Sequence, residues 1–218
     1  MNDKPVQTAL GGVTYLEHIP AMPKRERILA RLGHRAATTI LTDDQTAFLE
    51  RGIEEALLLC HVKGAYRRIP VAECTDRIIR LENGTVFQSA GLAQLLSRST
   101  EVVLMASTAG SAIMQRIAEE VSTGSAALGL ILDATASHAA DAGLDWMVSF
   151  LNGTLQRHGK RLTSRRFSPG YGDLSLEHQR IIFDLLDLDR MGLFLTEKYM
   201  LIPEKSVLAI AGIEGITE

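Results

Sequence analysis

The chain has 218 residues, of which 46% are hydrophobic and 22% are charged, and its formal net charge is −3. A chain of this length and balance can bury one substantial core, which excludes an intrinsically disordered protein. Its basic residues are dispersed among acidic ones, so we expect no nucleic-acid partner. No stretch approaches the roughly 18–20 apolar residues of a membrane span, so we expect no membrane partner either.

The two cysteines, Cys60 and Cys74, are too few for a disulfide framework and lack the spacing of metal ligands. We therefore expect a reduced, cytoplasmic protein in which both thiols are buried as small hydrophobic side chains. The six histidines share no helical face or ligand spacing, so no metal site is expected.

Residues 1–23 mix glycine, proline and polar residues, and they are expected to form a loosely held arm. A single domain is predicted over residues 24–218. Its first helix is predicted over residues 24–32, with Gly33 ending it in the left-handed conformation.

Two local signals define the next elements. Thr42 and Gln45 have the spacing of a capping box, and an apolar stripe at helical period follows them, so a second helix is predicted. The Asn-Gly pair at 83–84 predicts a hairpin between residues 77–81 and 85–88.

A strand, a loop and a helix follow in order. Ser89 is predicted to cap a short helix over residues 91–96, and residues 101–106 form a β-branched, apolar strand. The small residues at 107–110 then lead into a helix that ends at Val121. Such a loop could cradle an anion, but it lacks the lysine of a P-loop, and a tight turn is the favoured interpretation.

A long helix is predicted over residues 137–156 from its buried apolar stripe. Asp141, Asp145 and Asn152 recur on it at spacings of four and seven, so they lie on one side. They form a solvated face unless something cationic comes to lie beside them.

The last elements complete the expected fold class. Ser175 is predicted to cap a helix over residues 176–189, and residues 194–202 and 207–213 are predicted to form a hairpin. Hairpins and helices are mixed without regular alternation of strands and helices. This favours an α+β fold with a largely antiparallel twisted sheet and flanking helices.

The loop at residues 166–172 carries the main chemical signal. Arg166 offers a planar fork of donors that matches a carboxylate, and Gly170 and Gly172 permit close approach of backbone to a ligand. Pro169 stiffens the loop, and Tyr171 presents a ring for stacking. The loop suits a small molecule with a carboxylate at one end and a planar group at the other. The alternative is a glycine-rich loop whose arginine pairs with a nearby aspartate.

The pattern Arg166-x-x-x-Gly170-Tyr171 resembles the S-adenosylmethionine-binding motif of the reactivation domain of cobalamin-dependent methionine synthase. The resemblance continues in order through Gly192, Leu195-Thr196-Glu197, Pro203 and Ser206-Val207. Three features depart from the family pattern, and one is the further aromatic contact that the family segment contributes beyond the last hairpin, where this chain has none. The family usually has a Cys-Pro pair after its Gly-Tyr, where this chain has Gly172-Asp173-Leu174-Ser175, and Lys160 stands at a second acidic position.

The resemblance implies roles for five residues. Arg166 would hold the methionyl carboxylate of S-adenosylmethionine, and Ser168 and Gly170 would supply backbone contacts. Tyr171 would flank the nucleoside or the sulfonium, and Asp145 would lie near the cationic amino or sulfonium group. No catalytic residue and no metal ligand is implied in this chain.

The resemblance also implies a function. The chain would be a free-standing reactivation subunit, a component of a methyltransferase system, acting on a methionine synthase or other corrinoid protein that carries the cobalamin. There an external electron donor reduces cob(II)alamin and S-adenosylmethionine methylates it. Two alternatives stay open: a docking module for a corrinoid methyltransferase without methyl transfer of its own, and an unrelated hydrolase built on Ser107-Thr108 and a histidine.

Overall fold

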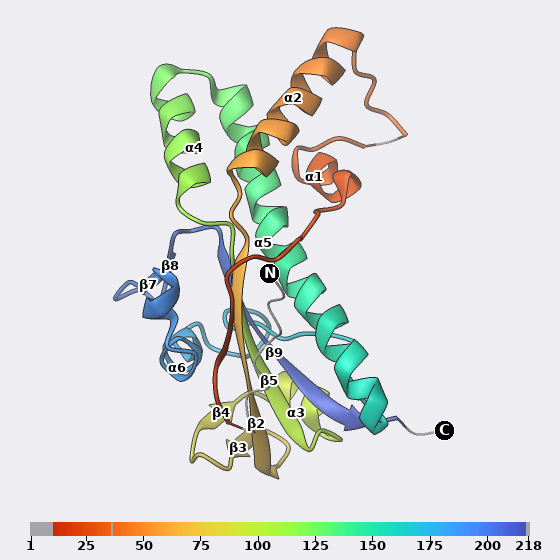
Figure 1. Ribbon diagram of the computed structural model, residues 1–218, viewed down its shortest axis with the longest axis vertical. Coiled ribbons are helices and arrows are strands. Elements are labelled where there is room, and N and C mark those ends of the chain that lie inside the picture. Colours follow the sequence, from red (N-terminus) through yellow and green to blue (C-terminus); the bar gives the residue numbers. More distant parts are fainter. Residues whose placement is uncertain (1–10, 36, 217–218) are drawn as a thin grey trace, which may run out of the picture.

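The computed structural model describes residues 11–35 and 37–216. Within these residues the chain forms a strongly twisted antiparallel sheet with helices on both faces (Figure 1). The predicted α+β class is confirmed. Seven strands make up the sheet, in the order β4-β3-β2-β5-β9-β6 with β1 on β2, and they are β1 (Thr14–Leu16), β2 (Lys63–Cys74), β3 (Ile78–Leu81), β4 (Val86–Gln88), β5 (Glu101–Thr108), β6 (Lys160–Leu162) and β9 (Ser206–Gly215).

The remaining elements surround this sheet. A second, two-stranded sheet pairs β7 (Phe194–Leu195) with β8 (Leu201–Ile202). The α-helices of the described residues are α1 (Arg25–Arg31), α2 (Asp43–Leu59), α3 (Ala90–Leu96), α4 (Ala112–Thr123), α5 (Ala126–Leu155) and α6 (His178–Leu185). Short 3-10 turns follow α5 and α6 at Gln156–His158 and Leu188–Met191. None of the helices in these described stretches is both long and apolar enough to cross a membrane.

Strand β5 is the centre of the molecule, and all of its residues are buried. Its side chains alternate between the two faces of the sheet, as the period of two in a strand requires. Val102 and Leu104 join the core beneath α3 and α6, whereas Val103 and Met105 pack against α5. Both faces are therefore covered.

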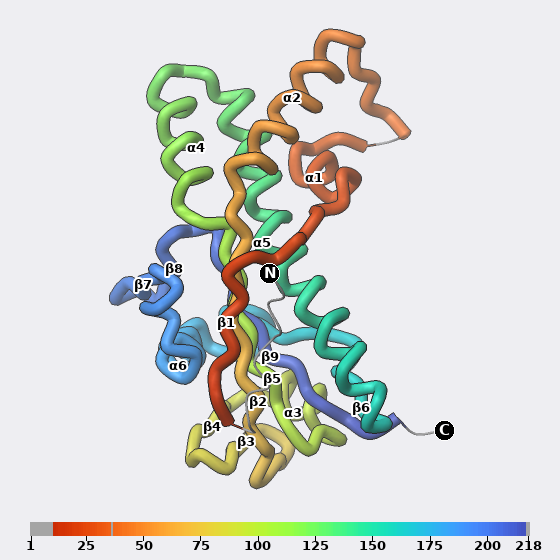
Figure 2. The backbone as a smooth tube through the Cα atoms, in the orientation of Figure 1, coloured from red at the N-terminus to blue at the C-terminus, as the bar shows by residue number. Residues whose placement is uncertain are grey.

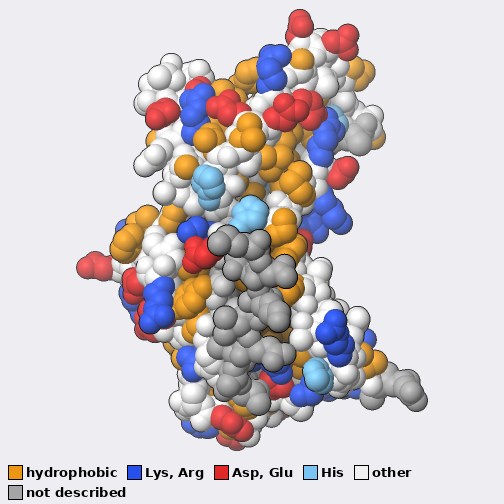
Figure 3. Space-filling view, viewed as in Figure 1, with side chains coloured by type: hydrophobic (Ala, Val, Ile, Leu, Met, Phe, Trp, Pro, Cys, Tyr) orange, Lys and Arg blue, Asp and Glu red, His pale blue; other side chains and the backbone are white. Residues whose placement is uncertain are grey.

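Helix α5 links the two halves of the molecule. Its C-terminal half crosses one face of the sheet, and its N-terminal half continues past the end of the sheet beside α1, α2 and α4 (Figures 1 and 2). On the face drawn in Figure 3, basic and acidic side chains are interspersed. The sheet-covering half of α5 lies beside the loop at residues 163–172, and the main cleft of the molecule opens there.

Several local predictions are confirmed. The capping box of Thr42 and Gln45 begins α2, and Ser89 caps α3 through the backbone N–H of Leu92. Gly33 follows α1 with φ +83°, and Gly84 turns the β3–β4 hairpin with φ +85°. These signals succeed because each depends on residues only a few positions apart.

Three predictions for chain segments are wrong. Helix α5 begins at Ala126, well before the predicted residue 137. The prediction missed its first turns because they are apolar on all sides and show no amphipathic period. Ser175 caps no helix: its hydroxyl donates to Glu177, and α6 begins at His178. The hairpin of residues 194–202 with 207–213 does not form, because β9 pairs instead with β5 and β6.

The expectation of a loosely held arm is wrong for its second half. Strand β1 pairs with β2, with Tyr15 opposite Ala65, and Ile19 is buried in the core beneath α5. Residues 1–10 lie outside the described residues. The division of the chain at residue 23 stays a prediction.

One buried ion cluster ties the sheet together, and it yields a stability prediction. Glu101, only 7% exposed, accepts hydrogen bonds from Arg68 of β2 at 2.7 Å and from Lys160 of β6 at 3.0 Å. Burial raises the pKa of Glu101, but the hydrogen bonds from Lys160 and Arg68 outweigh burial and hold the pKa below its ordinary value. Lys160, which departs from the family pattern, thus has a structural partner.

Glu101→Gln is expected to lower the free energy of unfolding by about 2 kcal/mol at pH 7, because it leaves two cations without a buried counter-charge. The carboxylate contributes fully above about pH 4.3 and loses its contribution as the pH falls through its lowered folded pKa. Urea unfolding at pH 7 and pH 3 measures this, and the difference from wild type should shrink in acid. Glu73→Gln, in the exposed pair with Arg80, is the control and should change stability by less than about 0.5 kcal/mol.

Candidate functional site

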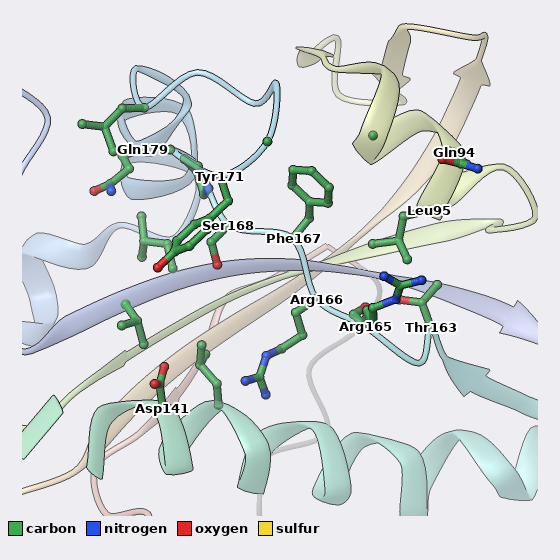
Figure 4. A pocket seen from close by; sticks show the side chains of 18 of the residues that line it. Gln94, Leu95, Asp141, Thr163, Arg165, Arg166, Phe167, Ser168, Tyr171 and Gln179 are labelled. Carbon is green, nitrogen blue, oxygen red and sulfur yellow. The ribbon is translucent and has the colours of Figure 1, made fainter. Parts of the chain in front are cut away.

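A cleft of about 1170 Å³ opens between the loop at residues 163–172 and the elements α3, α5, α6, β8 and β9. Figure 4 shows the loop crossing above α5, with Arg166 pointing toward the helix and Tyr171 on the side of α6. Ligand sites for small molecules are typically about 300–1,000 Å³. The cleft therefore has room for a nucleoside with an amino-acid substituent.

The sheet and α3 hold the loop in place. The backbone N–H of Phe167 donates to Ile210 of β9 at 2.9 Å, and the N–H of Ile210 donates back to Phe167 at 2.8 Å. The Phe167 ring lies so close to Gly91 and Gly172 that a Cβ on either would approach it within 3.2 Å. Glycine at these positions allows the ring to lock the loop against α3.

Asp173 forms a second anchor between the loop and α3. Its carboxylate accepts a hydrogen bond from the Ser89 hydroxyl at 2.5 Å and from the backbone N–H groups of Ala90 and Gly91 at 2.6 and 3.2 Å. The bond from Ser89, with those from the two amides, holds the pKa of Asp173 below its ordinary value. A carboxylate at the first turn of a helix is favourably placed. Asp173, which departs from the family pattern, thus ties the loop to the start of α3.

Arg166 lines the cleft and is held by Asp145 of α5. Its Nη1 donates to Asp145 Oδ1 at 2.6 Å, and Arg27 of α1 lies 3.5 Å from Asp145 Oδ2. The Arg166 side chain is 24% exposed. Two guanidinium groups share the one carboxylate of Asp145, so Asp145 does not fully neutralise Arg166. An arginine carries five N–H donors, so the bond to Asp145 leaves donors for an anionic ligand.

The structure brings most of the residues expected from the sequence to one cleft. Ser168, Gly170 and Tyr171 line it together with Arg166, and Gly170 adopts φ +89°. The N–H of Gly170 donates to Leu174 at 2.8 Å, so any ligand contact from Gly170 falls to its carbonyl. The Tyr171 side chain is largely exposed at the mouth of the cleft.

Asp145 lies behind Arg166 and is not among the cleft-lining residues. It lines a separate hollow of about 230 Å³, together with Arg27, His138 and Trp146. The acidic side chain of α5 that lines the cleft is Asp141, one turn earlier on the helix (Figure 4), and Glu214 of β9 also lines the cleft. The shared face of Asp141 and Asp145 was visible in their spacing, but which of the two faces the cleft was not.

Several polar residues of the cleft were not predicted from the sequence, among them Gln179 of α6 and Ser206 of β9. The Ser206 hydroxyl lies 2.7 Å from the Pro203 carbonyl oxygen and 2.8 Å from the Thr108 hydroxyl. Neither residue belongs to a local motif with a recognisable spacing, although Ser206 lies within the segment that carried the resemblance.

The expected tight turn at residues 107–110 is wrong, because Ser107 and Thr108 continue strand β5 and the next two amides are already hydrogen-bonded. The N–H of Ala109 donates to Lys205, and the N–H of Gly110 donates to the Thr108 hydroxyl. Ser107 is fully buried against Gly143, and its hydroxyl has no partner among the described residues. A nucleophile must be reachable by its substrate, so a hydrolase built on Ser107 is excluded.

Cys60 and Cys74 are only partly buried, contrary to the expectation, and burial raises the pKa of both thiols. Burial raises the pKa of the Cys60 thiol to about 12, which makes its reactive thiolate scarce. Within residues 11–35 and 37–216, no three His, Cys, Asp or Glu side chains gather as metal ligands do.

Neither a protein-family model nor a curated protein sequence matches the chain. Its structure is similar to the crystal structure of the MetH reactivation domain bound to AdoHcy, with a TM-score of 0.64, and the match covers 98% of this chain and 82% of that chain. The chain has the fold of the MetH reactivation domain. Sequence identity is 16%, so the similarity shows the fold alone and assigns no role to individual residues of the cleft.

Proposed function

We propose that this chain is a cytoplasmic protein that binds S-adenosylmethionine in the cleft and supports reductive methylation of cob(II)alamin on a partner methionine synthase. The observation that carries the proposal is the placement of Arg166, which reaches a large cleft in the fold of a domain solved with AdoHcy bound. The partner would carry the cobalamin, and an external donor would supply the electron.

The amino-acid end of the ligand would lie near α5. The free donors of Arg166 would grip the methionyl carboxylate, and Asp145 would orient the guanidinium from behind. Asp141, which lines the same cleft beside Arg166, is the acid of α5 available to the cationic amino or sulfonium group. Arg166 and Asp141 thus offer one cation and one acid to the oppositely charged groups at the amino-acid end of the ligand.

The nucleoside end would lie toward α6. The Tyr171 ring would flank the nucleoside or the sulfonium, and the backbone of Ser168 and the carbonyl of Gly170 would contact the ligand. The exposure of Tyr171 leaves its ring free to close over a bound ligand. This arrangement fills the cleft from the guanidinium to its mouth.

In the proposed chemistry, this chain contributes by orienting the bound S-adenosylmethionine. Reduced cobalt on the partner would be the nucleophile, so no general base is needed here. The chain would hold the sulfonium methyl in line with the metal and exclude water, which can supply several kcal/mol of a barrier reduction. No residue of this chain is assigned an acid–base role.

Calorimetric titration of the chain with S-adenosylmethionine tests the proposal. A micromolar to submillimolar dissociation constant is expected, and no heat of binding at millimolar ligand would end the proposal. Reactivation is tested by adding the chain, ligand and a reductant to a cob(II)alamin-bearing methionine synthase fragment and following the visible spectrum of the cobalt. Complex formation without any ligand-dependent change in cobalt state would select the docking alternative, for this or another corrinoid methyltransferase.

Asp173→Ala is expected to weaken S-adenosylmethionine binding about fivefold, because the loop would lose its anchor to α3 and pay an ordering cost on binding. Calorimetry measures the change. The pKa of Asp173 is lowered, so the anchor is complete above about pH 3.9 and is lost as the pH falls through the lower folded value. Asp76→Ala, at an exposed turn, is the control; equal effects of both variants would refute the anchoring role.

A further inference from the structure

Gln179 of α6 lines the cleft, and the contacts within the described part of the protein leave its side-chain oxygen without a hydrogen bond. Its Oε1 atom is shielded from solvent, and no described residue supplies a hydrogen bond to it. A buried amide oxygen without a partner is costly to a folded protein, and a ligand often supplies the missing donor. Figure 4 shows Gln179 beside Tyr171, on the side of the cleft away from α5.

The two ends of the cleft differ in chemistry. The α5 end carries the charges of Arg166 and Asp141, whereas the α6 end presents the neutral carboxamide of Gln179 and the ring of Tyr171. A ligand with a charged amino-acid end would therefore place its neutral, planar end beside Gln179. A carboxamide matches the edge of adenine, because its oxygen accepts from the N6 amine while its N–H₂ donates to a ring nitrogen.

We infer that Gln179 is the residue that selects adenine over other bases in this cleft: its carboxamide turns toward the ligand, and Oε1 accepts a hydrogen bond from the 6-amino group. The inference rests on the proposed function and names a specificity-determining residue within it. Stacking on Tyr171 accepts any planar base and cannot distinguish one purine from another. A hydrogen bond with the carboxamide of Gln179 supplies the discrimination that stacking lacks.

Gln94 is a matched control. It is the other glutamine that lines the same cleft, but it projects from α3 and is exposed, so its amide is solvated. Substituting methionine at either position keeps the length of the side chain and removes the amide. Only Gln179 should affect the recognition of the base.

The experiment compares wild type, Gln179→Met and Gln94→Met by calorimetry with two ligands: S-adenosylhomocysteine and its analogue with hydrogen in place of the 6-amino group. Wild type and Gln94→Met should bind S-adenosylhomocysteine about tenfold more tightly than the analogue. Gln179→Met should bind S-adenosylhomocysteine about tenfold more weakly than wild type and bind both ligands within about twofold of each other.

Thermal unfolding without ligand separates recognition from a structural role. Gln179→Met should unfold at the same temperature as wild type or higher, because it removes an unsatisfied buried oxygen. A lower midpoint would make Gln179 structural and overturn the inference. An unchanged ligand ratio in Gln179→Met, or a ratio that collapses in Gln94→Met, would also overturn it while the proposed function stands. Wild type that binds neither ligand would overturn both.

Discussion

Arg166→Ala is expected to weaken S-adenosylmethionine binding about 100-fold, which corresponds to about 2.7 kcal/mol. The guanidinium would hold the ligand carboxylate by charge-assisted hydrogen bonds in a partly desolvated cleft, where removing one partner costs about 2–5 kcal/mol. Arg166→Lys should recover part of this loss, because an ammonium keeps the charge but lacks the planar fork. Calorimetry on the three proteins measures both effects.

The assignment of Arg166 to the carboxylate predicts which ligand will respond. Methylthioadenosine lacks the amino-acid end, so its affinity should be the same for wild type and Arg166→Ala. Arg80→Ala, which removes a surface guanidinium paired with Glu73, should leave binding of both ligands unchanged. If Arg166→Ala weakens methylthioadenosine as strongly as S-adenosylmethionine, the side chain supports the cleft without contacting the carboxylate.

The ion pair between Arg166 and Asp145 shows what sequence could and could not predict at this site. The loop with its arginine, glycines and tyrosine was identified because its residues are adjacent in the chain. The alternative interpretation, an arginine paired with a nearby aspartate, describes the same side chain, since Arg166 both pairs with Asp145 and lines the cleft. Which acid of α5 faces the cleft depends on how the helix crosses the sheet, and no local pattern encodes that crossing.

For the fold too, local features were predictable from the sequence and long-range pairings were not. Capping residues and the Asn-Gly turn act over a few positions and predicted α2, α3 and the β3–β4 hairpin. The partners of β9 are not local: it pairs with β5, about a hundred residues earlier in the chain, and with β6. Pairing over such separations is decided by which apolar faces can share a core. Gln179 was missed for a similar reason, because its role depends on a cleft assembled from distant segments.

Gly143→Ala is expected to lower the free energy of unfolding by about 2–3 kcal/mol and the thermal midpoint by roughly 5–10 °C. A Cβ at residue 143 would overlap the Ser107 hydroxyl and come within 2.9 Å of Val62, because α5 packs directly on β5 here. In an open helix the same substitution stabilises by up to about 1 kcal/mol. Gly153→Ala on α5, with no atom near its Cβ, is the matched control and should raise the midpoint.

The overlap can be relieved from the other side. Ser107→Ala removes the buried hydroxyl that has no partner among the described residues, so it should be neutral or slightly stabilising alone. Combined with Gly143→Ala it should recover a large part of the lost stability, a coupling that a double-mutant cycle measures.

The same contact affects the ligand site. Gly143 lies on α5 between Asp141 and Asp145, so the close packing of the helix on the sheet also fixes the positions of these two side chains. Gly143→Ala should therefore weaken S-adenosylmethionine binding, and the double variant should restore binding and stability together. Additive effects of the two substitutions would show that the helix tilts or slides without the strain predicted here.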